Sequence, residues 1–270
     1  MTPAVSGPLA YLGITFILAW GAWFLVARGG LTPKDSTRFQ LAILPGACAP
    51  AAAAFLVRWL IAKQGFSAAE FTPKIVTAWP YYLAGLLAPV LIALVSYGLA
   101  RATGLARHAR ETRPIRSRLR FLATLPLVAI LTAPFQFGEE FGWRAFFQAG
   151  VTPSWPLLAA VLTGLVWSLW HLPLLRAGYT YPSEKAKGFV AFTVHTVLLS
   201  IFLGWIYART GDIWAVCLAH MANNAIGVSA VESLLPGEAK RHLIGYEGLM
   251  TAIPLGAICL VIVLTGGLAG

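Results

Sequence analysis

Residues 121–147 have the sequence FLATLPLVAILTAPFQFGEEFGWRAFF, in which a long apolar run ends in two adjacent carboxylates and an arginine. A carboxylate at membrane depth is costly unless it is paired or faces a polar cavity. The stretch therefore predicts a membrane-embedded helix that carries a functional polar cluster of Glu139, Glu140 and Arg144.

The composition of the whole chain supports this interpretation. Of its 270 residues, 58% are hydrophobic and only 11% are charged, whereas soluble domains carry roughly 25% charged residues. The net charge of +10 comes from Lys and Arg that lie between apolar runs, as is typical of cytoplasmic loops. No basic stripe alternates with aromatic residues, so we expect a lipid bilayer and no nucleic acid as partner.

Eight apolar runs are each about as long as the 20 residues that a helix needs to cross a bilayer. They span residues 8–26, 39–61, 79–100, 121–137, 155–175, 188–207, 213–231 and 248–268. We expect an all-α, polytopic membrane protein with about eight transmembrane helices that enclose a polar cavity, and a single membrane-embedded domain over residues 1–270. The small residues of 46–54 predict close helix packing in the second span. The pattern leaves open whether Glu139 continues the fourth helix or starts another.

Orientation follows from the basic loops, which come mostly after the odd-numbered spans. Segment 101–120 is the most basic, so these loops are predicted to be cytoplasmic and both termini external. Counting spans then places Glu139 and His171 at different depths. Broken helices around a cavity would reconcile them.

The ionisable residues inside the spans fall at helical spacings. Glu140 and Arg144 are four residues apart, so they share a helix face and can neutralise each other. Glu139 points about 100° away and lacks that partner. An unpaired carboxylate in low dielectric holds a proton more readily than one in water, as a general acid or base requires.

Two other spans repeat this arrangement. His220 and Asn224 are four residues apart, as are Trp167 and His171. Together with Glu139, these polar faces could activate a water molecule and stabilise an oxyanion. Coincidence is a poor explanation for the combined set.

Other polar residues have structural explanations. An intramembrane histidine such as His195 is often only hydrogen-bonded to a carbonyl group, and its role stays open. Asn223 would bridge helices. His108 and His242 lie in polar loops, where we expect them to be solvated.

Cofactor and nucleophile chemistry is weakly supported. The chain has no HExxH motif. If a metal such as zinc were present, Glu139, His171 and His220 would hold it, but an amide oxygen is a poor zinc ligand, and no cofactor is required. The three cysteines lie in apolar segments without CxxC spacing, and no GxSxG occurs, so neither a disulfide framework nor a serine or cysteine nucleophile is indicated.

Taken in order, the three polar faces resemble the motifs of the CAAX-protease and bacteriocin-processing (CPBP/Abi) family of intramembrane endopeptidases. Its EExxxR motif matches Glu139 to Arg144, and its HxxxN motif matches His220 to Asn224. Its FxxxH motif matches Trp167 to His171, with Trp167 in place of the usual phenylalanine. The resemblance covers a core of about residues 120–230.

The resemblance implies a function and a role for each motif residue. Glu139 and His171 would activate the attacking water, and His220 and Asn224 would stabilise the oxyanion. Glu140, Arg144 and Trp167 would support the site. The substrate would be a membrane-associated peptide or protein, with or without a lipid group, because the best-known members cleave prenylated CAAX proteins. The expected location is a prokaryotic cell membrane.

A non-catalytic function is the alternative. Transporters also use intramembrane Glu and His for proton relay, and an immunity or scaffold protein could retain the same fold. No internal repeat of the transporter kind is evident in the sequence.

Overall fold

The computed structural model describes residues 3–35, 37–105, 115–234 and 240–268 and is helical throughout, with no strand among these residues. Within these described ranges, seven helical segments are long and apolar enough to cross a membrane. They are Gly7–Arg28, Thr37–Ile61, Ala68–Ala102, Arg120–Val151, Lys185–Thr210, Ile213–Val231 and Arg241–Leu264. The prediction of an all-α, multi-pass membrane protein is confirmed.

The elements in chain order begin with α1 (Pro3–Arg28), η1 (Pro33–Asp35), α2 (Thr37–Ala47), α3 (Ala49–Leu56), η2 (Val57–Ile61), η3 (Ala68–Glu70) and α4 (Ile75–Ala102). The central elements are α5 (Ile115–Thr132), η4 (Ala133–Gln136), α6 (Phe137–Glu140), η5 (Phe141–Gln148), α7 (Ala149–Val151), α8 (Pro156–Trp170) and α9 (Leu172–Arg176). The last are α10 (Lys185–Thr210), α11 (Ile213–Ala222), η6 (Asn223–Val228), α12 (Ser229–Leu234), α13 (Arg241–Ile244) and α14 (Leu249–Leu264). Here η2, η5 and η6 are π-helical, and η1, η3 and η4 are 3₁₀ turns.

The fifth predicted span, residues 155–175, is shorter than expected. Its helix α8 has 15 residues and ends at Trp170, and the separate α9 follows. Pro173 lies in the first turn of α9, where it lacks an N–H to continue the ladder of α8. The break places His171 at the joint between the two helices, as expected of a broken helix beside a cavity.

The fourth span answers the question that the sequence left open. The chain stays helical from α5 through η4, α6 and η5 to α7, so Glu139 lies inside a continuous helical segment of changing pitch. The orientation of the protein in the membrane remains a prediction. Arg107, Arg110 and Arg113 of the basic loop, and His108, lie outside the described residues.

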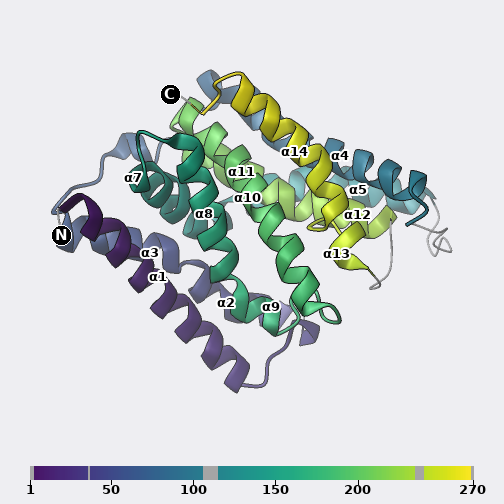
Figure 1. Cartoon of the computed structure of the whole chain (residues 1–270), viewed down its shortest axis with the longest axis horizontal. Helices are drawn as coiled ribbons and strands as arrows, with labels where there is room; N and C mark the ends of the chain where they lie inside the picture. Colours follow the sequence, from purple (N-terminus) through teal and green to yellow (C-terminus); the bar gives the residue numbers. More distant parts are fainter. Residues whose placement is uncertain (1–2, 36, 106–114, 235–239, 269–270) are drawn as a thin grey trace.

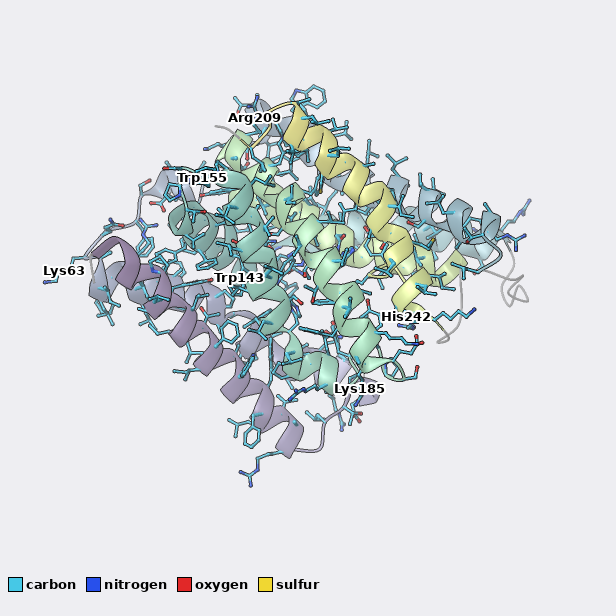
Figure 2. The ribbon with its side chains drawn as sticks, in the orientation of Figure 1. Lys63, Trp143, Trp155, Lys185, Arg209 and His242 are labelled. Carbon is cyan, nitrogen blue, oxygen red and sulfur yellow. The ribbon has the colours of Figure 1, made fainter. Side chains whose placement is uncertain are left out.

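The two most buried spans, α10 and α11, form the centre of the molecule. α10 packs against α8, α11 and α14, and α11 also packs against α4, while α1 lies with α2 and α3 on one side (Figure 1). Over an 18-residue stretch of each span, 61% of the residues are buried in the α10 span and 67% in the α11 span, compared with 22% in the first span. Trp143 lies among the helices, whereas Lys63, Lys185 and Arg209 lie at the edge of the molecule (Figure 2).

Close helix contact in the second span, predicted from its small residues, is confirmed. α3 packs directly against α6 and η5. A Cβ atom added to Gly142 would lie 2.4 Å from the carbonyl carbon of Pro50, and one added to Gly138 would lie 2.9 Å from Cα of Cys48. These two glycines bracket the glutamate pair, so backbone contact with α3 fixes the position of Glu139 and Glu140.

We predict that Gly142→Ala destabilises the protein by about 1–3 kcal/mol or more, because the new methyl group must displace the backbone of α3. Thermal unfolding of the detergent-solubilised protein measures the effect. Gly98→Ala is the matched control, since a Cβ atom on Gly98 would meet nothing within 4 Å. Equal melting temperatures for the two variants would contradict the close contact.

Candidate active site

A buried ion pair lies next to the cavity wall and holds α6 and η5 together. Arg144 Nη1 donates to Glu140 Oε1 at 2.9 Å, and both side chains are fully buried. The pairing that the i,i+4 spacing predicted is therefore confirmed. The same Glu140 oxygen also accepts from His220 Nδ1 at 2.5 Å, a contact across 80 positions that no local spacing could reveal. This contact joins α6 to α11.

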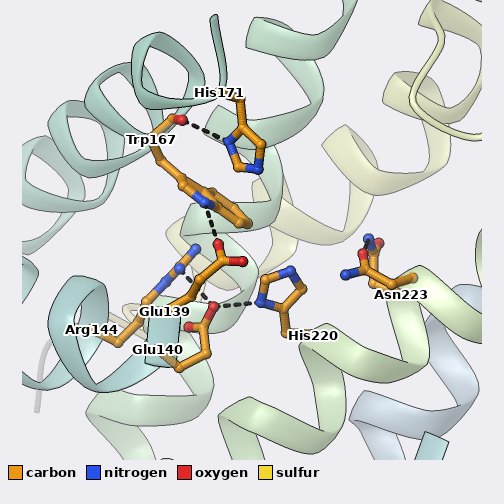
Figure 3. Close-up of polar contacts among 8 residues, drawn as sticks. Glu139, Glu140, Arg144, Trp167, His171, His220 and Asn223 are labelled. Atoms are coloured by element: carbon orange, nitrogen blue, oxygen red, sulfur yellow. Dashed lines mark hydrogen bonds and ion pairs between the residues drawn. The ribbon is translucent and has the colours of Figure 1, made fainter. Parts of the chain in front are cut away.

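Glu139 points to the other side of the segment and toward α8. Trp167 Nε1 donates to Glu139 Oε2 at 2.9 Å. The sequence analysis left Glu139 without a partner, and the structure corrects this. Arg144 pairs with Glu140, whereas Glu139 is bound by Trp167 of α8 (Figure 3). No described residue bonds to Oε1 of Glu139, so this oxygen is available to a ligand.

His171 is fixed by its backbone surroundings. Its Nδ1 lies 2.9 Å from the carbonyl oxygen of Trp167. Because a carbonyl can only accept, Nδ1 carries the proton, and Nε2 of the neutral ring presents a lone pair. The rings of Trp170 and Phe192 lie edge-on at 4.7 and 5.0 Å between centroids. Packing and one hydrogen bond together orient the imidazole.

The two asparagines begin a π-helical turn that the sequence did not predict. α11 ends at Ala222 and η6 starts at Asn223. Because a π turn is wider than an α turn, residues four apart, such as His220 and Asn224, no longer lie on one helix face. Such turns occur often at functional sites. Asn223 is buried and Asn224 is exposed. Asn223 Nδ2 donates to Asn224 Oδ1 at 3.2 Å, which leaves the amide N–H₂ of Asn224 free to donate.

These groups border one cavity of about 640 Å³. Glu139, His171, His220, Asn223 and Asn224 all line it, and so does Trp167, whereas Glu140 and Arg144 lie behind the wall. Apolar side chains make up much of the remaining wall, among them Leu41, Leu44, Phe135, Leu174 and Leu199. The cavity thus combines the carboxylate of Glu139, imidazoles and amides with a largely apolar wall, which Arg241 and Glu247 also line.

His195 and His242 have surroundings that differ from those expected from the sequence. His195 borders the cavity, is 1% exposed and lies edge-on to Tyr246, and neither ring nitrogen has a partner among the described residues. The carbonyl partner expected for His195 is therefore absent. His242 is not solvated as expected, because its Nδ1 pairs with Glu184 Oε2 at 2.6 Å and its side chain is 13% exposed.

The cavity holds side chains of the types that ligate metals, among them Glu139, His171 and His220. Among the described residues, no three His, Cys, Asp or Glu side chains form a group that could hold a metal ion. Glu139, His171 and His220, the set predicted to hold any metal, are therefore not drawn together as a ligand group in this structure. Nδ1 of both His171 and His220 bonds to the protein and leaves Nε2 open, as metal-ligating histidines also do, so the absence of a metal stays a prediction.

Comparison with known proteins adds independent information. Residues 119–226 match the family described as "Type II CAAX prenyl endopeptidase Rce1-like". The chain is also 28% identical over 186 residues to "CAAX prenyl protease 2" of Methanococcus maripaludis, a match that covers 66% of each chain. The matched family segment contains all three motifs, from Glu139 to Asn224. The family resemblance stated from the sequence is thereby confirmed.

We predict that Glu140→Gln destabilises the protein strongly, by about 3–5 kcal/mol, because it leaves the buried Arg144 charge uncompensated. Glu139→Gln should change stability far less, since the amide oxygen still accepts from Trp167. Thermal unfolding of both variants checks the contrast between two adjacent residues of one type. A larger loss of stability for Glu139→Gln than for Glu140→Gln would show that Glu139, and not Glu140, is the structural residue of the two.

Proposed function

We propose that this chain, whose central segment matches the Rce1-like family of CAAX prenyl endopeptidases, is an intramembrane endopeptidase whose water nucleophile is activated by Glu139 and His171. One observation carries the proposal. A carboxylate oxygen of Glu139 and the free nitrogens of His171 and His220 border one cavity within a helical membrane protein. That set supplies a base, an orienting acceptor and an oxyanion donor.

In the proposed reaction, Glu139 acts as the general base. Its free Oε1 takes a proton from water while the water oxygen bonds to the scissile carbonyl carbon, and the carbonyl π electrons move to its oxygen. Nε2 of His171 accepts a hydrogen bond from the second water proton and orients the attack. Glu139 then delivers its proton to the peptide nitrogen as the C–N bond breaks, which releases an amine and a carboxylic acid. The acid then gives its remaining proton to solvent and becomes a carboxylate.

His220 and Asn224 are assigned to the oxyanion. Since Nδ1 of His220 donates to Glu140, a second donor at Nε2 requires the imidazolium form, whose charge is adjacent to the Glu140 carboxylate. The amide of Asn224 is oriented by Asn223, which donates to its oxygen. Losing one oxyanion donor typically lowers kcat by roughly 100- to 1,000-fold.

The substrate is proposed to be a membrane-associated peptide or protein that carries a lipid-type apolar group. Most of the cavity wall is apolar, with Leu41, Phe135 and Leu174 among its lining residues, which favours an apolar substituent. The relative from Methanococcus maripaludis is named as a CAAX prenyl protease. A prenylated cysteine near the scissile bond matches both observations.

The reaction as proposed needs no metal. Glu139 performs both proton transfers of the proposed reaction, and Nε2 of His171 orients the water.

We predict that Glu139→Ala, His171→Ala and His220→Ala each abolish cleavage, a loss of about 100- to 10,000-fold as expected for general acid–base groups. Comparative analysis of the peptides in membranes from cells that carry each form measures it. His242→Ala is the control, because His242 pairs with Glu184 and does not line the cavity. Undiminished cleavage by Glu139→Ala, with all variants inserted equally, would refute the proposal.

Chelation provides a second prediction. Dialysis of the purified protein against a strong zinc chelator should leave its peptidase rate unchanged within about twofold, because no step uses a metal. The rate is measured before dialysis, after dialysis, and after zinc is restored. A rate that is lost on chelation and restored by zinc would instead assign Glu139, His171 and His220 as ligands.

A further inference from the structure

Trp167 contacts more of the site than any residue assigned a chemical step. Its indole Nε1 donates to Glu139, its carbonyl oxygen accepts from His171, and its ring centroid lies 5.2 Å from that of His220. The guanidinium carbon of Arg144 lies 4.3 Å from the ring centroid. One side chain on α8 thus links α6, η5 and α11 around the cavity (Figure 3).

The charges around the ring match its electrostatics. An aromatic ring is negative over its face and positive at its edge. The Arg144 cation lies over the face, and the Glu139 carboxylate lies at the N–H edge. The ring is held between opposite charges and is only 2% exposed, so it has little freedom to rotate.

The hydrogen bond to Glu139 differs from those of other indoles in the described chain. Trp20, Trp23 and Trp214 donate to backbone carbonyls. Trp143 and Trp170 are buried, and their Nε1 atoms have no partner among the described residues. Only a bond to an ionised oxygen is charge-assisted, and such bonds are short and roughly twice as strong as neutral ones.

The consequence for Glu139 is an asymmetry between its two oxygens. A free carboxylate can rotate and present either oxygen to water. Here Oε2 is occupied by Trp167 Nε1 at 2.9 Å, so Oε1 alone remains for a proton transfer. Fixing a reacting group in one orientation removes an entropic part of the barrier.

We propose that Trp167 is a positioning residue for Glu139, whose indole N–H holds Oε2 and thereby makes Oε1 the oxygen that takes the proton from water. The inference rests on the proposed function and adds a residue that acts through Glu139 without touching the reacting atoms. The Glu140–Arg144 pair acts on Glu139 through the same ring, because Arg144 holds its face.

Trp167→Phe tests the proposal, because phenylalanine keeps a ring for Arg144 and His220 but removes the N–H. With a farnesylated CAAX peptide as probe, kcat should fall about 10- to 100-fold, as expected for one hydrogen bond to a charged group, while KM changes less than about threefold. Trp143→Phe is the matched control. This variant makes the same change in side-chain size and also removes a buried indole N–H. The N–H of Trp143 has no partner among the described residues, and Trp143 does not line the cavity.

The second readout needs no turnover. In protein labelled with ¹⁵N at the tryptophan indoles, the resonance that disappears in Trp167→Phe belongs to Trp167. We expect this resonance to move upfield in Glu139→Ala and to stay in place in His242→Ala. Because this shift reports the hydrogen bond alone, it separates failure of the positioning role from failure of the peptidase activity.

Three outcomes would overturn the proposal. The first is an indole resonance of Trp167 that is unmoved in Glu139→Ala. The second is a kcat for Trp167→Phe equal to that of Trp143→Phe. The third is a loss that falls entirely on KM, which would make the indole a substrate-binding surface.

Discussion

A single oxygen atom organises the centre of this protein. Glu140 Oε1 accepts from Arg144 and from His220, and these contacts are buried where no water can replace them. Each partner alone would be too costly to bury, so the groups hold one another in place. The bond to His220 joins two helices far apart in sequence and sets the angle at which the imidazole faces the cavity. Glu139 is left free of that network because the adjacent glutamate supplies it.

Departures from regular helix place the remaining groups. η4 is a 3₁₀ turn before the glutamate pair, and the π-helical η5 follows it. α8 ends just before His171, and η6 begins at Asn223, three residues after His220. A regular α-helix would carry side chains past a cavity at a fixed pitch. These local changes in pitch allow four separate segments to direct polar groups into one chamber, while contact between Gly142 and Pro50 keeps the segments close.

The sequence was sufficient for the features that depend on local periodicity and composition. Run length predicted eight spans, of which seven are long apolar helices among the described residues and the fifth is the shorter α8, and i,i+4 spacing predicted the Glu140–Arg144 pair. It was insufficient where partners are distant or the pitch changes. Nothing in the spacing indicates that Trp167 donates to Glu139 or that His220 bonds to Glu140. The short α8 and the burial of Asn223 depend on a proline position and a π turn, whose effects are decided by tertiary packing.

The central claim is that a water molecule activated by Glu139 cleaves a peptide bond inside the membrane. The most direct measurement incubates membranes containing the wild-type protein or Glu139→Gln in ¹⁸O-water and identifies the new carboxyl termini by mass spectrometry. The account predicts termini that carry one ¹⁸O atom from hydrolysis and appear only with the wild-type protein. The same labelled termini in equal amounts from Glu139→Gln membranes would contradict it.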